Sequence, residues 1–325
     1  MFVPHNGCPH QCSFCNQRSI VGQAYQPNGD DVKFAIETAL NSLKENSVNA
    51  EIAFFGGSFT AIDRKYMLSL LDATVPYIDK FKGIRISTRP DCIDEEVLLI
   101  LKAYKVTSIE LGAQSMDDYV LTANNRGHSS TDVYNASKLI KDYGFSLGLQ
   151  MMTGLYMSNA EKDIETAKRF IEINPDTVRI YPTIVMKHTE LERLYNNGEY
   201  LAVDLESSVD ICSKLLLMFN EAQIQVIRLG LHHSDSLSCD MVAGPYHPAF
   251  RELCESKILF DKLTAMLNGI DKIKEITVHI NPSCISKLIG NKKVNLTKLK
   301  DLGYNIKILQ DKSVKEMDIV INYEG

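Results

Sequence analysis

The alternation of short apolar runs with segments of helical period constrains the fold of this chain more than any other feature. From residue 31 to about residue 230, the runs predict strands and the intervening segments predict helices. Strands and helices that alternate at this spacing form parallel β–α–β units. The predicted strands are 1–4, 51–56, 83–88, 108–113, 146–152, 177–182 and 224–230, and the predicted helices are 31–46, 64–79, 94–104, 130–143, 160–173 and 205–222.

The number of these units predicts a partial (β/α)6-type barrel, an α/β fold whose site lies at the C-terminal ends of the strands. A doubly wound open sheet is the alternative. With 325 residues, the chain is long enough for one domain of barrel size and a small second unit. We therefore expect a barrel with its C-terminal extension over residues 1–267 and a small module over residues 268–325.

The last part of the chain has a different rhythm. It predicts a strand at 275–280, two short helices joined by a tight link at 291–293, and two further strands. This α+β order resembles a KH module, in which the link between the helices clamps a nucleic-acid backbone. Because the second glycine of such a link is absent here, we favour a packing role over RNA contact.

Composition limits the partners that we expect. The formal net charge of −6 and the sequence pI of about 5.8 argue against a surface built to neutralise many phosphates. No apolar stretch approaches the roughly 20 residues needed to span a bilayer, and the N-terminus does not resemble a signal peptide. The sequence therefore predicts a cytoplasmic protein without membrane contact.

Three of the eight cysteines, Cys8, Cys12 and Cys15, lie within one short segment after the first predicted strand. A tight loop there can direct three sulfurs at one metal centre. One interpretation is a zinc site completed by His5 or His10. The other is an iron–sulfur cluster held by three thiolates, which leaves one iron open to chelate a small-molecule cofactor. The lack of a fourth cysteine in the loop suits the second interpretation.

The cysteine loop, with Phe14 before its last cysteine, resembles the CxxxCxxC motif of the radical S-adenosylmethionine superfamily. About forty residues later, the segment 54–60 (FFGGSFT) resembles the glycine motif of that superfamily. The resemblance implies a [4Fe–4S] cluster on the three cysteines and S-adenosylmethionine as the second cofactor. It also implies that the backbone at Gly56 and Gly57 binds the methionine amino group, and glycines suit such a close approach.

Further positions resemble the branch that contains oxygen-independent coproporphyrinogen oxidase and the elongator catalytic subunit. The resemblance implies that Ser87 lies near the methionine amine, where coproporphyrinogen oxidase has a carboxylate. It implies that Gln114 and Gln150 contact ribose hydroxyls and that Met152 lies beside the adenine. Arg126 would pair with the methionine carboxylate, which suits a planar guanidinium. The alternative for the two glutamines is that they are buried strand amides.

Two segments, 153–157 and 231–235, depart from the pattern of that branch, and both are expected at the mouth of the barrel. They offer hydrogen-bonding side chains to a polar small molecule, although exposed loop positions are the alternative. A guanine-like base presents an N–H and an amino group, for which a carboxylate is the natural acceptor. Asp235 is the first candidate for this acceptor, and Glu51 is the second. The candidate substrate-binding residues are Tyr156, His232, His233 and Asp235.

Within this branch, the size and the altered loops resemble the queuine lyases. That resemblance implies a deazaguanine-type base as substrate, hydrogen abstraction from its cyclopentenediol side by a 5′-deoxyadenosyl radical, and cleavage of a carbon–nitrogen bond. It also implies an electron donor such as flavodoxin or ferredoxin.

Two alternatives remain open. One is radical modification of a transfer-RNA base by an elongator-like enzyme without an acetyltransferase domain, supported by Lys287, Lys292 and Lys293 near the link of the C-terminal module. The other is a zinc-stabilised nucleic-acid-binding module without catalysis.

Overall fold

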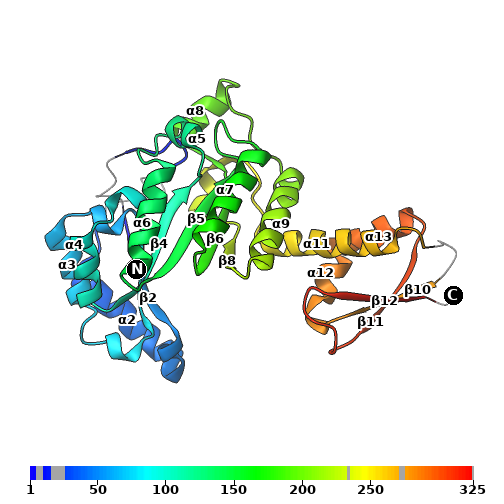
Figure 1. Cartoon of the computed structure of the whole chain (residues 1–325), viewed down its shortest axis with the longest axis horizontal. Helices are drawn as coiled ribbons and strands as arrows, with labels where there is room; N and C mark the ends of the chain where they lie inside the picture. Colours follow the sequence, from blue (N-terminus) through cyan, green and yellow to red (C-terminus); the bar gives the residue numbers. More distant parts are fainter. Residues whose placement is uncertain (5–9, 16–25, 233–234, 271–274, 324–325) are drawn as a thin grey trace.

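A seven-stranded sheet forms the centre of the larger part of the molecule (Figure 1). The structure, a computed structural model, describes residues 1–4, 10–15, 26–232, 235–270 and 275–323. The strands of this sheet are β1 (Phe2–Val3), β2 (Glu51–Gly56), β3 (Gly83–Thr88), β4 (Val106–Gln114), β5 (Ser146–Thr153), β6 (Thr177–Pro182) and β8 (Gln225–Leu229).

The strands follow one another across the sheet in chain order, and every neighbouring pair is parallel. A doubly wound sheet reverses its strand order at a switch point, and the order here has no reversal. Each crossover therefore advances in the same direction and places its helix on the same face. This arrangement confirms the predicted partial barrel and is inconsistent with the doubly wound alternative.

Six longer helices cover the outer face of the sheet (Figure 1). They are α2 (Gly29–Leu43), α3 (Arg64–Asp72), α4 (Glu95–Ala103), α6 (Ser130–Asp142), α7 (Ala160–Ile173) and α9 (Leu205–Glu221). Helix α3 ends at Asp72, although the sequence predicted a helix to residue 79. Pro76 lacks the N–H that a continuing helix needs, and the chain passes instead into turns and a 3-10 helix at Ile78–Lys80.

Shorter elements lie between these units. The short helices are α5 (Asp118–Ala123), α8 (Glu190–Asn196) and α10 (Asp235–Asp240), and a two-stranded ribbon consists of β7 (Val185–Met186) and β9 (Met241–Ala243). The 3-10 helices of this part are η1 (Lys44–Asn49), η2 (Phe59–Ala61), η3 (Ile78–Lys80) and η4 (Pro90–Cys92).

The two faces of the barrel sheet differ in chemistry. In β4, the side chains of Ile109 and Leu111 are fully buried on the face that packs against the helices. Side chains alternate along a strand, so Ser108, Glu110 and Gly112 lie on the inner, concave face. The inner face therefore carries polar groups while the outer face supplies the hydrophobic core.

Helix α11 (Phe250–Leu267) connects the barrel to the C-terminal module (Figure 1). Phe250, Cys254 and Ile258 belong to the barrel core. Leu259, the next residue, and Leu263 belong to the core of the module. Because one helix contributes to both cores, the expected division after residue 267 stays a prediction.

The module has the predicted order of strand, two helices and two strands. Its elements are β10 (Glu275–Ile280), η5 (Pro282–Cys284), α12 (Ile285–Ile289), η6 (Asn291–Lys293), α13 (Val294–Asp301), β11 (Asn305–Gln310) and β12 (Ile319–Tyr323). Strand β10 lies in the middle of the sheet, parallel to β11 and antiparallel to β12. Lys292 and Lys293 in the link between the helices both have a left-handed backbone. None of the helices in the described part of the chain has the length and apolar character needed to cross a membrane.

Candidate active site

The cysteine loop follows β1 at the C-terminal edge of the sheet. Cys12 is buried and Cys15 is half-buried, whereas Cys8 lies outside the described residues. The N–H of Cys15 donates a hydrogen bond to the carbonyl of Cys12 at 3.1 Å. A single tight turn therefore holds these two predicted cluster ligands.

Asn124, at the end of α5, anchors the cysteine loop. The N–H of Ser13 donates to the carbonyl of Asn124 at 3.1 Å, and the Ser13 hydroxyl donates to Asn124 Oδ1 at 2.6 Å. Asn124 Nδ2 then donates to the carbonyl of Tyr156 at 2.9 Å. This fully buried amide thus joins the cysteine loop to the segment 153–157, a link that the sequence analysis missed.

Arg126 lies directly against the cysteine loop. Its Nη1 donates to Cys12 Sγ at 3.1 Å, and its Nη2 donates to the carbonyl of Gly112. Its Nε is buried and has no hydrogen-bond partner in the described part of the chain. The structure therefore brings a predicted cluster ligand and the predicted partner of the methionine carboxylate into contact.

Gln114 ends β4 next to Arg126. Its backbone is left-handed, with φ at 69°, which costs a non-glycine residue about 1 to 3 kcal/mol. Gln114 Oε1 is buried and receives no hydrogen bond from the described residues. A Cβ on Gly112 would lie 3.1 Å from Gln114 Nε2 and 3.6 Å from Arg126 Nη2, so the missing side chain leaves room between the two groups. An unpaired acceptor and an unpaired donor here fit the hydroxyl and carboxylate groups of S-adenosylmethionine.

The glycine segment ends β2 beside β1. Gly56 has φ at 125°, and a Cβ there would lie 2.7 Å from the carbonyl of Val3. The N–H of Gly57 donates to the same carbonyl at 3.0 Å. Packing against β1 is therefore a structural reason for glycine at residue 56, alongside the cofactor role that the resemblance implies.

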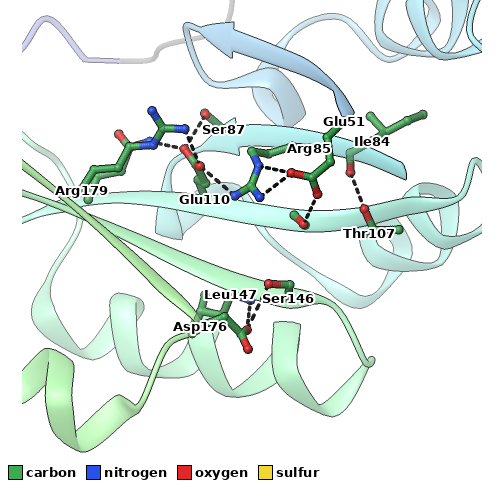
Figure 2. Close-up of polar contacts among 12 residues, drawn as sticks. Glu51, Ile84, Arg85, Ser87, Thr107, Glu110, Ser146, Leu147, Asp176 and Arg179 are labelled. Carbon is green, nitrogen blue, oxygen red and sulfur yellow. Dashed lines mark hydrogen bonds and ion pairs between the residues drawn. The ribbon is translucent and has the colours of Figure 1, made fainter. Parts of the chain in front are cut away.

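A charged network crosses the inner face of the barrel (Figure 2). Glu110, with only 2 % of its side chain exposed, accepts four hydrogen bonds. Its Oε1 accepts from Arg85 Nη1 at 2.9 Å and from Arg179 Nη2 at 2.8 Å. Its Oε2 accepts from Gln150 Nε2 at 2.9 Å and from Ser87 Oγ at 3.4 Å. Ser87 and Gln150, two predicted cofactor contacts, therefore share one carboxylate oxygen.

Glu51 extends this network toward the N-terminal end of the barrel (Figure 2). Its Oε2 accepts from Nε and Nη2 of Arg85, and its Oε1 accepts from Ser108 Oγ at 2.8 Å. Burial acts to raise the pKa of Glu51, but the hydrogen bonds from Ser108 and Arg85 offset this effect and lower the pKa. Both oxygens are occupied, so Glu51 does not offer the free acceptor that the sequence analysis considered for a base.

Sequence reasoning missed the rest of this network, although a signal was present. Arg85, Glu110 and Arg179 each stand alone as a charge within a predicted apolar strand. A charge in a buried strand requires a partner, and parallel neighbours can supply it.

His128 is a buried histidine two residues after Arg126. Burial and the positive charge of Arg126 lower its pKa to about 4, so the ring is neutral near pH 7. Its Nε2 donates to the carbonyl of Ala113 at 3.1 Å. The neutral ring adds no charge to that of Arg126.

Of the predicted substrate residues, Tyr156 follows β5 and His232 follows β8. Tyr156 packs edge-on against Tyr200, with ring centroids 6.3 Å apart, and lines a hollow of about 390 Å³. His232 is exposed, and burial together with Arg228 and Arg179 lowers its pKa. His233 lies outside the described residues, and Asp235 is the first residue of α10. Met152, on the inner face of β5, is half-buried and pairs in register with Tyr181.

Comparison with known proteins gives matches over most of the chain. The model of the Radical SAM superfamily matches residues 2–171, and that of the Radical_SAM C-terminal domain matches residues 175–259. An uncharacterized protein of Methanocaldococcus jannaschii is 31% identical over 65% of this chain and 68% of its own length. The tRNA uridine(34) acetyltransferase of Dehalococcoides mccartyi is 25% identical over 59% of this chain and 50% of its own. Human Elongator complex protein 3 is 30% identical over 55% of this chain and 37% of its own length.

Solved structures show the same fold at low identity. Elp3 of Methanocaldococcus infernus superposes with a TM-score of 0.62 at 23% identity, covering 72% of this chain and 59% of that one. SuiB of Streptococcus suis bound to S-adenosylmethionine superposes with a TM-score of 0.53 at 14% identity, covering 73% of this chain and 51% of that one. This chain thus spans half or less of the two named curated relatives.

The sequence matches favour the iron–sulfur interpretation of the cysteine loop over the zinc alternative. The unpaired polar atoms of Gln114 and Arg126 lie beside that loop. The chain therefore belongs to the radical SAM superfamily, whose members use a [4Fe–4S] cluster and S-adenosylmethionine.

Proposed function

We propose that this radical SAM enzyme removes a hydrogen atom from a small nucleobase-like substrate and acts as a queuine lyase. One observation carries the proposal that the substrate is small and polar. The inner face of the barrel, beside Arg126 and Cys12, holds a network of charged and amide side chains rather than an apolar core. Such side chains can form hydrogen bonds with the polar groups of a small molecule, without contacts from a nucleic-acid backbone.

In this proposal, each part of the chain has a defined task. The three cysteines hold the cluster, Arg126 holds the methionine carboxylate, and Gln114 accepts a hydrogen bond from the ribose. When bound and reduced by a donor such as flavodoxin or ferredoxin, these cofactors supply the 5′-deoxyadenosyl radical. Gly112 leaves the space between Arg126 and Gln114 open to the cofactor.

The substrate would lie on the other side of the cofactor, under the segments 153–157 and 231–235. Tyr156, His232 and His233 would contact its polar side chain, and the Asp235 carboxylate would accept from the pairing edge of the base. Hydrogen abstraction on the cyclopentenediol side would then lead to carbon–nitrogen cleavage and release of an aminomethyl-deazaguanine.

The curated relatives favour a second candidate, radical modification of a transfer-RNA base, because one of them is a tRNA uridine(34) acetyltransferase. Lys292 and Lys293 lie in the link of the C-terminal module and could contact RNA. Lys287 is engaged with Glu255 at 2.8 Å.

Anaerobic incubation separates the two candidates. Cluster-loaded protein, S-adenosylmethionine and a reductant are mixed with queuine or with transfer RNA, and 5′-deoxyadenosine and the base products are measured. We expect queuine to be consumed with release of the aminomethyl base. Asp235→Asn should keep cofactor binding but lose turnover, because the amide turns one acceptor into a donor that faces the donors of the base. Modified transfer RNA with unchanged queuine would instead establish the second candidate.

A further inference from the structure

Two arginines face each other on neighbouring strands of the inner face. Arg179 on β6 and Arg228 on β8 are direct partners in the register of the parallel pair. Side chains at paired positions point to the same face of a sheet, and like charges placed directly opposite each other are destabilising. Such a pair therefore calls for a compensating negative charge.

The carboxylates of the network do not supply this charge. Glu110 is shared between Arg85 and Arg179, and Glu51 is bound to Arg85. Arg228 forms no ion pair with any carboxylate that the structure describes, and its Nε donates to the carbonyl of Gly230 at 3.0 Å. The three arginines thus exceed the two glutamates by one positive charge.

The arginine pair also has an N–H donor without a hydrogen-bond partner. Arg179 Nε is buried and lacks a hydrogen-bond partner within the described chain. Burial lowers the pKa of Arg228, and the charge of Arg179 acts in the same direction, whereas Tyr181 partly offsets them. Arg228, although not Arg179, also lines a hollow of about 420 Å³, whose lining includes Arg251 and Glu252.

We propose that Arg179 and Arg228 form an oxyanion-binding subsite that receives a phosphate of the substrate. The inference rests on the proposed function and sharpens it, because it makes the preferred substrate a nucleoside 5′-phosphate that carries the base. Two guanidinium groups suit a phosphate, whereas they repel the ammonium group of the queuine side chain. The amine would therefore point away from the pair, toward the reacting end of the site.

Binding measurements on the cluster-loaded full chain, with S-adenosylmethionine present, test this subsite. The probes are queuine, its nucleoside queuosine, and queuosine 5′-phosphate. We expect the 5′-phosphate to bind at least tenfold more tightly than the nucleoside. Arg228→Ala should remove that preference and change the affinity for queuine less than twofold, and Arg228→Lys should retain part of it. Arg193→Ala, which removes an exposed arginine paired with Glu190 and Glu199, is the matched control.

Three outcomes would overturn the subsite. One is equal affinity for queuosine and its 5′-phosphate in the wild-type protein, and continued queuine turnover would then leave the proposed function intact. Another is that Arg228→Ala weakens the binding of S-adenosylmethionine while the phosphate preference persists, which would assign the pair to the cofactor carboxylate. The third is a clear fall in unfolding temperature for Arg228→Ala, since relief of repulsion predicts an unchanged or higher value. Conversely, an Arg228-dependent phosphate preference without turnover of any probe would retain the subsite and reject the lyase.

Discussion

The barrel and the C-terminal module differ in whether one or both faces of their strands are buried. In the module, β10 buries Ile276 and Val278 on one face and leaves Thr277 only half-buried on the other. In the barrel, β4 buries both faces, with Ile109 against the helices and Glu110 on the inner side. Burying a charge costs free energy unless it is fully paired, so a strand keeps one mainly where it contributes to a site.

The two regions also differ in net charge. Residues 268–325 have ten lysines, no arginine and seven acidic residues, a formal net charge of +3, which leaves −9 for the rest of the chain. Asp318 of the module pairs at the surface with Lys262 of α11, whereas Glu110 pairs with Arg85 and Arg179 inside the barrel. We expect the chemistry to lie in the barrel, and four substitutions with matched controls can test this expectation.

The largest effect is expected at the cysteine loop. Cys12→Ala should remove most of the iron and all cleavage of S-adenosylmethionine, because a cluster with two protein thiolates is not held. Cys284→Ala, in the buried core of the module, should leave both unchanged. Iron and sulfide analysis and 5′-deoxyadenosine production measure the two quantities. An active Cys12→Ala protein would contradict the assignment of the cluster.

Loss of the inner network should lower the free energy of unfolding more than loss of a surface ion pair does. Glu110→Ala leaves Arg85 and Arg179 without their shared carboxylate, and loss of one partner of a buried pair costs about 3 to 5 kcal/mol. Lys262→Ala breaks an exposed pair between α11 and the module and should cost at most about 1 kcal/mol. Urea unfolding followed by circular dichroism compares the two. Equal losses would show that the inner charges are no more important than surface pairs.

Arg126→Ala should weaken the binding of S-adenosylmethionine without changing the iron content. A charge-assisted contact in a partly desolvated site contributes about 1.5 to 3 kcal/mol, or roughly ten- to more than a hundredfold in affinity. Lys287→Ala, which breaks a half-buried pair at the module, is the control and should bind the cofactor normally. Calorimetry under anaerobic conditions gives both affinities, and an unchanged value for Arg126→Ala would reject its proposed role.

A smaller and more specific effect is expected at Asn124. Asn124→Ala removes the amide between the cysteine loop and the segment 153–157, and should raise the ratio of 5′-deoxyadenosine to product several-fold. Asn295 is a similarly buried amide in the module, where it donates to Ser256 Oγ at 2.9 Å. Both variants should lose about 1 to 3 kcal/mol of stability, but only Asn124→Ala should change the ratio. An equal ratio in the two variants would show that Asn124 acts only in folding.

The sequence was sufficient to predict features that depend on neighbouring residues. The strands follow from local apolar runs, and the cysteine loop follows from spacing within eight residues. Helix α3 was predicted seven residues too long because Pro76 was not weighed as a helix breaker.

Contacts between distant residues could not be predicted in this way. Arg85 and Arg179 lie 25 and 69 residues from Glu110, and Ser13 lies 111 residues from Asn124. These pairings depend on the register between strands and on the path of the loops, which a single strand or loop does not specify.

Helix α11 has a consequence for the geometry of the whole molecule. Its 18 residues run without a break from the barrel core to the module core, so the helix sets the angle between them. Each added residue advances a helix by about 1.5 Å and turns it by roughly 100°. One residue inserted between Ile258 and Leu259 would rotate the module about the helix axis by more than a quarter turn. Seven inserted residues would return the module to nearly its original orientation and move it about 10 Å further from the barrel. Length changes in this helix would therefore preserve the orientation of the module only when they add up to nearly whole turns, as seven residues do.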